Sequence, residues 1–83
     1  MITREATFNA APSITPDFAA ELAHNASQFS ANVYIVRDNT KLSVDSLIGI
    51  LSLDLRKGDR VTVTAEGVDE AASIARVCEI LQG

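Results

Sequence analysis

The sequence predicts an α+β fold in which helices cover one side of an antiparallel sheet. First, the hydrophobic periodicity switches along the chain in the order β-α-β-β-α-β-α, which gives four strands and three helices. Second, the expected strands each have one polar face, as in a sheet with one side in water. Third, 83 residues are enough for one domain, expected to span residues 1–83, with a small but sufficient core.

The first half of the chain predicts a strand and a helix. Apolar and polar residues alternate over Ile2–Phe8, and a loop follows at 9–13. Thr15-Pro16-Asp17 predicts a helix start, because threonine caps, proline needs no N–H in the first turn, and the carboxylate favours the positive end of the helix dipole. We expect the helix to end within 27–30. Its expected buried stripe is Phe18, Leu22, Ala26 and Phe29.

The remaining elements follow from turn residues and periodicity. Asn32–Arg37 and Lys41–Val44 are expected to pair as a hairpin across the Asp38-Asn39 turn. After a short helix and a loop at 54–59, clean alternation predicts a fourth strand over Arg60–Glu66 that Gly67 ends. Asp69 is then expected to cap the last helix, with this inner face: Ala71, Ile74, Ala75, Val77, Cys78 and Leu81.

The short helix lies in residues 45–53, which form the longest nearly uninterrupted apolar run of the chain. Ser46 is expected to cap it, and Ile50, with Leu47 or Leu51, is expected to pack inward. One interpretation is a short core helix with a serine cap. The other is that the remaining apolar side chains, Ile48 among them, are exposed and form a partner surface, because exposed apolar clusters often mark such surfaces.

Composition excludes several classes of function. The formal net charge is −4 and the seven Lys and Arg residues are scattered, which argues against nucleic-acid binding. The single cysteine, Cys78, cannot form an internal disulfide and is expected to be a small core residue rather than a reactive thiol. The sequence has no apolar run long enough to span a membrane and no signal-peptide pattern at its start, so a cytoplasmic protein without a membrane partner is expected.

No catalytic set is visible, so the chain is predicted not to be an enzyme. His24 is the only histidine, and nothing at helical spacing from it supplies metal ligands or a nucleophile. We therefore expect a surface or rim histidine, no metal and no cofactor. Glu66, Asp69 and Glu70 cluster before the last helix, where they either complement its dipole or, alternatively, form a catalytic pair. The four glycines are isolated and form no phosphate loop.

The run Ser-Leu-Ile-Gly-Ile-Leu-Ser-Leu at 46–53 resembles the regulatory serine segment of the HPr-like phosphocarriers of the bacterial phosphotransferase system. Further positions support the resemblance along the whole chain: Ala19, Ala26-Ser27, Lys57-Gly58, Gly67 and Asp69-Glu70. The resemblance implies an open-faced β-sandwich, a four-stranded antiparallel sheet under three helices. It also implies a phosphoryl group accepted on a histidine at the start of the first helix and passed to sugar-transporter domains.

The active-site stretch departs from the family's Gly-Leu-His-Ala-Arg-Pro-Ala, because residues 13–19 read Ser-Ile-Thr-Pro-Asp-Phe-Ala. Thr15 occupies the histidine position and has no ring nitrogen for a labile phosphoramidate. Asp17 occupies the arginine position, where a carboxylate repels a phosphoryl group. The chain thus resembles the Crh-like branch, which lacks the histidine and keeps the serine, although Crh has glutamine at that position and usually retains the arginine.

The resemblance implies a non-catalytic regulatory or interaction protein linked to the phosphotransferase system. Ser46 would be its phosphorylation switch, and a docking patch would consist of Leu47, Ile48, Leu51 and Ala20. The implied partners are an HPr kinase, a transcription regulator or phosphotransferase enzymes, with the chain itself a monomer or a strand-swapped dimer.

Two alternatives stay open. One is a degenerate phosphocarrier that docks on phosphotransferase enzymes as a scaffold or competitor. The other, enzymatic, alternative is a stable phosphoester on Thr15, which would be a dead-end product. The acidic Asp17 and Asp45 also depart from the family's more basic surroundings.

Overall fold

A computed structural model describes all residues, 1–83, and has the expected element order. Its elements are β1 (Ile2–Thr7), α1 (Pro16–Ala26), β2 (Ala31–Arg37), β3 (Thr40–Ser43), α2 (Leu47–Ser52), β4 (Arg60–Gly67) and α3 (Glu70–Gln82). The bounds differ from the prediction by a residue or so: β1 ends before Phe8, β3 ends before Val44, and β4 includes Gly67.

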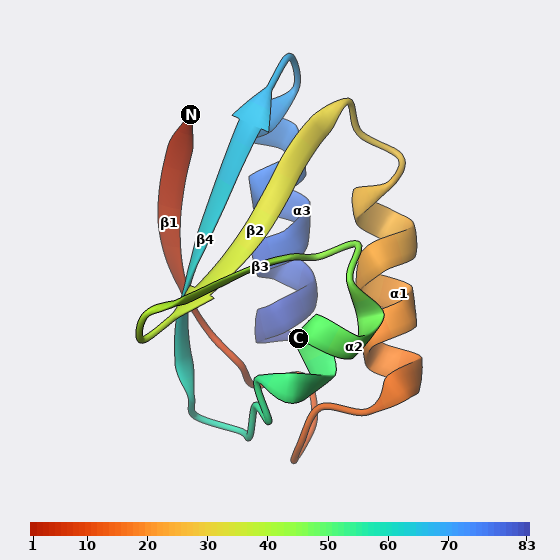
Figure 1. Ribbon diagram of the computed structural model, residues 1–83, viewed down its shortest axis with the longest axis vertical. Coiled ribbons are helices and arrows are strands. Elements are labelled where there is room, and N and C mark those ends of the chain that lie inside the picture. Colours follow the sequence, from red (N-terminus) through yellow and green to blue (C-terminus); the bar gives the residue numbers. More distant parts are fainter.

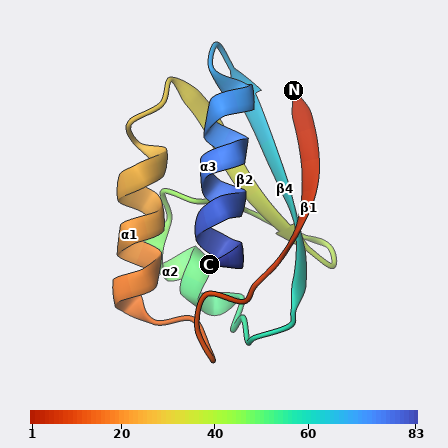
Figure 2. The same ribbon diagram turned by 180° about the vertical axis from the view of Figure 1, so that it is seen from behind.

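The four strands form one antiparallel sheet in the order β1-β4-β2-β3, and all three helices lie on one side of it (Figures 1 and 2). Side chains alternate between the two faces of each strand. Val63 and Ile35, which are paired across β4 and β2, therefore point toward the helices. Thr64 and its partner Tyr34 occupy the open face. The predicted α+β fold with one covered face is confirmed.

The core lies between the sheet and the helices and contains 17 buried hydrophobic residues. Every helix contributes: Leu22 from α1, Ile50 from α2 and Leu81 from α3 are fully buried. Leu55 is also fully buried, although it lies in the loop that the sequence predicts at 54–59. The loop is held inward because the Ile14 amide donates to the Leu55 carbonyl at 2.8 Å.

Several predicted details of the helices were wrong. Phe29 follows α1 and is only half-buried, so it does not extend the stripe, which instead includes Ala19. On α3, Ala71 and Ala75 are exposed, and Ser73 is buried in their place. Ser73 can be buried because its hydroxyl donates to the Glu70 carbonyl at 3.0 Å.

Asp69 precedes α3 but its side chain does not cap that helix. Its carboxylate oxygens accept the Ser30 amide hydrogen at 2.8 and 3.1 Å. The carboxylate therefore ties the end of the loop after α1 to the turn between β4 and α3. No helix is both long and apolar enough to traverse a bilayer.

Candidate functional site

Thr15 caps the first turn of α1. Its backbone is extended, and its Oγ1 accepts a hydrogen bond from the Phe18 amide at 3.2 Å. Pro16 opens the helix, where a missing N–H costs nothing. Asp17 is exposed in the same turn. The start of α1 thus presents the Thr15 hydroxyl, which already caps the helix, and beside it the Asp17 carboxylate. Neither side chain has a ring nitrogen that could accept a phosphoryl group.

A loop runs alongside the start of α1. Ser13 forms an isolated bridge with Arg56, and the Lys57 amide donates to the Pro12 carbonyl at 3.0 Å. Arg56 lies 3.6 Å from the Asp54 carboxylate in an exposed ion pair. This backbone pairing therefore brings two cations to the segment before Thr15: Arg56, already paired, and Lys57. No periodic pattern in the sequence indicates that this loop borders the site.

Ser46 caps α2, as predicted. Its Oγ accepts the Gly49 amide hydrogen at 3.2 Å, and its carbonyl accepts from Ile50 at 2.9 Å. A Cβ on Gly49 would lie 2.8 Å from the Ser46 Oγ, so glycine leaves room for the serine side chain. Ser46 is exposed, so its hydroxyl stands at the surface in the first turn of the helix.

The four residues predicted to form a docking patch lie on two helices that pack against each other, α1 and α2. Ile48 is 82% exposed and Leu47 is 40% exposed, whereas Ile50 is fully buried. Leu51 is partly buried against the core, and Ala20 is exposed on α1. The structure thus places Ile50, with Leu51, inward and Leu47 outward. We call Leu47, Ile48, Leu51 and Ala20 the apolar patch.

The other candidate residues lie apart from these two helix starts. His24 is exposed, with Nε2 3.4 Å from Gln28 Nε2. Glu70 lies 3.0 Å from the N-terminal amine and accepts the Gly67 amide hydrogen at 3.3 Å, so it has a structural use. No group of three or more His, Cys, Asp or Glu side chains is arranged to hold a metal ion.

Cys78 is buried in α3, in agreement with the predicted core role. Burial raises the pKa of its thiol, while the nearby Arg4 guanidinium lowers that pKa by its charge and a hydrogen bond. Because burial is the larger effect, the thiol is held in its protonated form.

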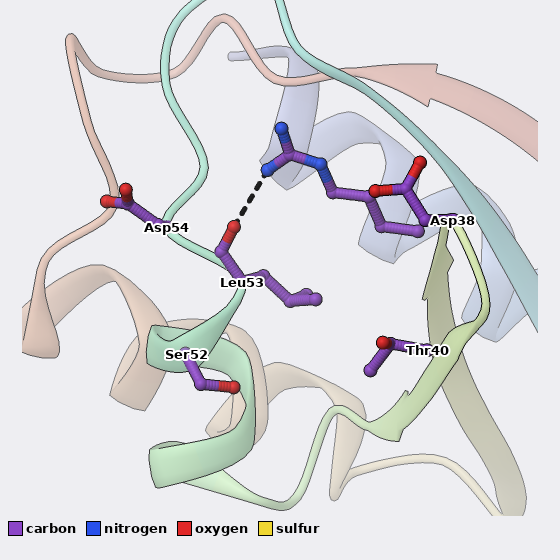
Figure 3. Close-up of a pocket in the computed structure, with 6 residues that line it drawn as sticks. Asp38, Thr40, Ser52, Leu53 and Asp54 are labelled. Atoms are coloured by element: carbon purple, nitrogen blue, oxygen red, sulfur yellow. Dashed lines mark hydrogen bonds between the residues drawn. The ribbon is translucent and has the colours of Figure 1, made fainter.

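Sequence reasoning missed a polar hollow of about 310 Å³ between the β2–β3 turn and the end of α2. Arg37 lines this hollow, and its guanidinium donates to the Leu53 carbonyl at 2.7 Å. In Figure 3 a dashed line reaches the carbonyl oxygen of Leu53. Arg37 also lies 3.3 Å from the Asp59 carboxylate. The guanidinium therefore joins the end of α2 to the loop before β4. No sequence pattern distinguished this arginine, because its partners lie 16 and 22 residues further along the chain.

Comparison with known proteins identifies what shares this architecture. Residues 2–83 match the family described as the PTS HPr component phosphorylation site. The HPr-like protein Crh of Bacillus subtilis (strain 168) is 30% identical over 64 residues, which cover 77% of this chain and 75% of Crh.

Solved structures agree with this assignment. HPr-C-His from Thermoanaerobacter tengcongensis superposes with a TM-score of 0.89 at 28% identity, covering 99% of this chain and 92% of the other. Crh from Bacillus subtilis, described as a swapped, intertwined dimer, has a TM-score of 0.79 at 25% identity and covers 92% of this chain and 83% of its own. The likeness therefore extends over sheet and helices alike.

Proposed function

The chain belongs to the HPr family of phosphotransferase-system proteins, close to Crh, and we propose that it is a non-catalytic regulatory or interaction member of that family. In this proposal it does not carry a phosphoryl group on a histidine at the start of α1. It acts instead through the apolar patch, with Ser46 as a phosphorylation switch. The two helices that present these features are adjacent in the fold (Figure 2).

One observation carries the proposal: Thr15, at the first cap of α1, uses its only side-chain oxygen to accept the Phe18 amide hydrogen. A threonine there has no imidazole nitrogen, and Asp17 adds a negative charge where a phosphoryl group would arrive. The only imidazole, that of His24, sits in the last turn of the same helix. Nine residues of helix separate the two positions by roughly 13 Å, at about 1.5 Å per residue.

The direct test incubates the chain with phosphoenolpyruvate and enzyme I and measures intact mass. We expect no gain of a phosphoryl group, whereas a histidine-containing HPr treated in parallel gains one that is lost in acid. An acid-labile phosphate on this chain would contradict the proposal. If one appears, a His24→Gln variant shows whether the lone histidine carries it.

The Ser46 switch is supported by the exposure of its hydroxyl and by its place at a helix start. A phosphoserine there adds about −1.5 to −2 charge where free amides and the helix dipole favour it. Incubation with an HPr kinase and ATP should add one phosphoryl group. Ser46→Asn should abolish the gain while keeping a cap, because asparagine also caps well. A mass gain that persists in Ser46→Asn would place the modification elsewhere.

The exposed apolar patch supports a second candidate, a degenerate carrier that docks on phosphotransferase enzymes as a scaffold or competitor. Ile48 is 82% exposed, a large apolar side chain with no packing role in this chain. An NMR titration with enzyme I distinguishes the candidates. Shifts centred on Leu47 and Leu51 would support docking without transfer, and their absence would remove this candidate.

The assembly state is proposed to be a monomer or a strand-swapped dimer, as the swapped dimer described for Crh suggests. Here β1 is an edge strand that pairs only with β4, over Ile2–Thr7. Sedimentation at several concentrations measures which form is present. In a swapped dimer the same β1–β4 contacts would join two chains.

A further inference from the structure

The apolar patch has an unusual electrostatic setting: the helices that present it contain no lysine or arginine. Neither α1 nor α2 includes a fixed positive charge. The seven basic residues all lie in other parts of the fold: Arg4, Arg37, Lys41, Arg56, Lys57, Arg60 and Arg76. Two of them, Arg56 and Lys57, lie in the loop that pairs with the segment before Thr15, and Arg56 is already paired with Asp54.

Three exposed carboxylates lie on or just before the two helices that present the patch. Asp17 lies in the first turn of α1, and Glu21 follows one turn later on the outward side of the same helix. Asp45 lies just before α2 and lines a hollow with Ala26, so it is near the other end of α1. None of the three takes part in an ion pair. We call Asp17, Glu21 and Asp45 the acidic rim.

The nearest cation on a neighbouring helix does not neutralise this rim. Arg76 of α3 borders the same hollow as Glu21, but its guanidinium lies 2.7 Å from the Glu79 carboxylate and 3.4 Å from Asn25. The rim charges therefore remain available to an incoming surface. An exposed apolar centre with a charged rim is the usual anatomy of a protein-binding site.

We propose that this face docks a protein whose binding surface is an apolar depression bordered by lysine and arginine. The proposal deepens the proposed function, on whose docking patch it rests, by naming the charge of the partner. An acidic partner surface would be repelled, because like charges facing each other across an interface cost binding energy. Phosphorylation of Ser46 would add negative charge to the same face and strengthen the preference.

The test uses the ¹⁵N-labelled chain of residues 1–83 and two helical amphipathic probe peptides. One peptide consists of leucine and lysine, and the other has glutamate in place of every lysine. We expect the basic peptide alone to bind, with amide shifts centred on Leu47, Ile48 and Leu51 and with affinity that falls as salt rises. Binding of both peptides alike, or shifts centred on the open face of the sheet, would overturn the proposal.

Two triple variants with equal net charge separate the rim from overall charge. The rim variant is Asp17→Asn, Glu21→Gln and Asp45→Asn. The control variant is Glu5→Gln, Asp38→Asn and Glu66→Gln, side chains without ion pairs or hydrogen bonds in the fold. Each changes the formal charge by three, from −4 to −1.

The rim variant should raise the dissociation constant of the basic peptide about tenfold, since each exposed ion pair changes binding by a few-fold. The control should change it by about twofold or less, because distant charges are screened. Equal losses in both variants would overturn the proposal. Loading by enzyme I tests the proposed function separately, since that assay measures phosphoryl transfer rather than binding at the acidic rim.

Discussion

At the scale of single residues, Thr64 has the one buried side-chain oxygen without a hydrogen-bond partner. It lies in the middle of β4 between Thr3 of β1 and Tyr34 of β2, so its neighbours cover it although it faces away from the helices. A buried hydroxyl that forms no bond loses its hydration without compensation. Thr64 therefore destabilises the sheet relative to an apolar side chain of similar shape.

Thr64→Val should raise the free energy of unfolding by about 1 kcal/mol, because it removes that unpaired hydroxyl. Thr62→Val, two residues earlier on the same face of β4, is the matched control. Thr62 is half-exposed, so its replacement should change stability by less than about 0.5 kcal/mol. Urea unfolding of the three proteins measures both values. A loss of stability in Thr64→Val would show that the hydroxyl has a partner in solution.

Cys78 makes stability depend on alkaline pH. Burial raises the pKa of its thiol in the folded state, so above about pH 8.5 the unfolded chain loses this proton first. The protonated thiol contributes its full stabilisation below the pKa that it has in the unfolded chain. This stabilisation is lost as the pH rises toward the pKa in the folded state, by up to about 1.4 kcal/mol per pH unit. The difference in unfolding free energy between the wild type and Cys78→Ala should therefore shrink as the pH rises above about 8.5. A constant difference would contradict this.

At the scale of elements, two glycines with positive φ have different tasks. Gly67 ends β4 at φ +144°, and a Cβ there would lie 2.8 Å from the Ala31 Cα and 2.9 Å from the Ser30 carbonyl oxygen. Gly58 has φ +97°, and a Cβ at that position would meet no atom within 4 Å beyond its chain neighbours. The first glycine permits close approach of β2 and β4, whereas the second only permits a turn.

Gly67→Ala should cost about 3 kcal/mol or more, because backbone strain and a clash with neighbouring backbone act together. Gly58→Ala should cost about 1–2 kcal/mol from backbone strain alone. Thermal or urea unfolding of both variants gives the ranking. Equal costs would mean that β2 moves aside without penalty.

The elements show which features of this chain were predictable. Local signals were sufficient for the order of the elements and for the caps at Thr15 and Ser46, because a cap depends on atoms within one turn. They failed for Asp69, whose carboxylate binds Ser30, 39 residues away. They also failed for Leu55, a lone apolar residue in a loop, which is buried because the loop pairs with the segment before α1.

The candidate site was predictable to the same extent. The exposure of Ile48 followed from too many apolar residues on a short helix, and the structure bears out that surplus. Which of Leu47 and Leu51 turns inward did not follow, because that choice depends on how α2 sits against α1. The hollow beside Arg37 left no local signal, since it joins three separated segments.

At the scale of the whole molecule, the backbone fold of the family can be tested separately from the side chains that phosphoryl transfer requires. The sheet and helices superpose on HPr-C-His with a TM-score of 0.89, so the backbone of the family is present. If Thr15 and Asp17 alone prevent phosphoryl transfer, then Thr15→His with Asp17→Arg should restore an acid-labile phosphate from phosphoenolpyruvate and enzyme I. Intact mass before and after acid treatment measures the gain, with wild type as the control.

The acidic rim adds a second barrier to loading by enzyme I, and the same double variant can reveal it. Glu21 and Asp45 remain in the double variant, and they would still repel an enzyme with an acidic docking surface. Adding Glu21→Gln and Asp45→Asn should then raise the loading rate by about tenfold, from two removed like-charge contacts of a few-fold each. If the double variant is loaded and the further substitutions do not change its loading rate, the block lies at the start of α1 alone. Failure of both variants, with folding intact by NMR, would show that phosphoryl transfer requires more of the surface than these four positions.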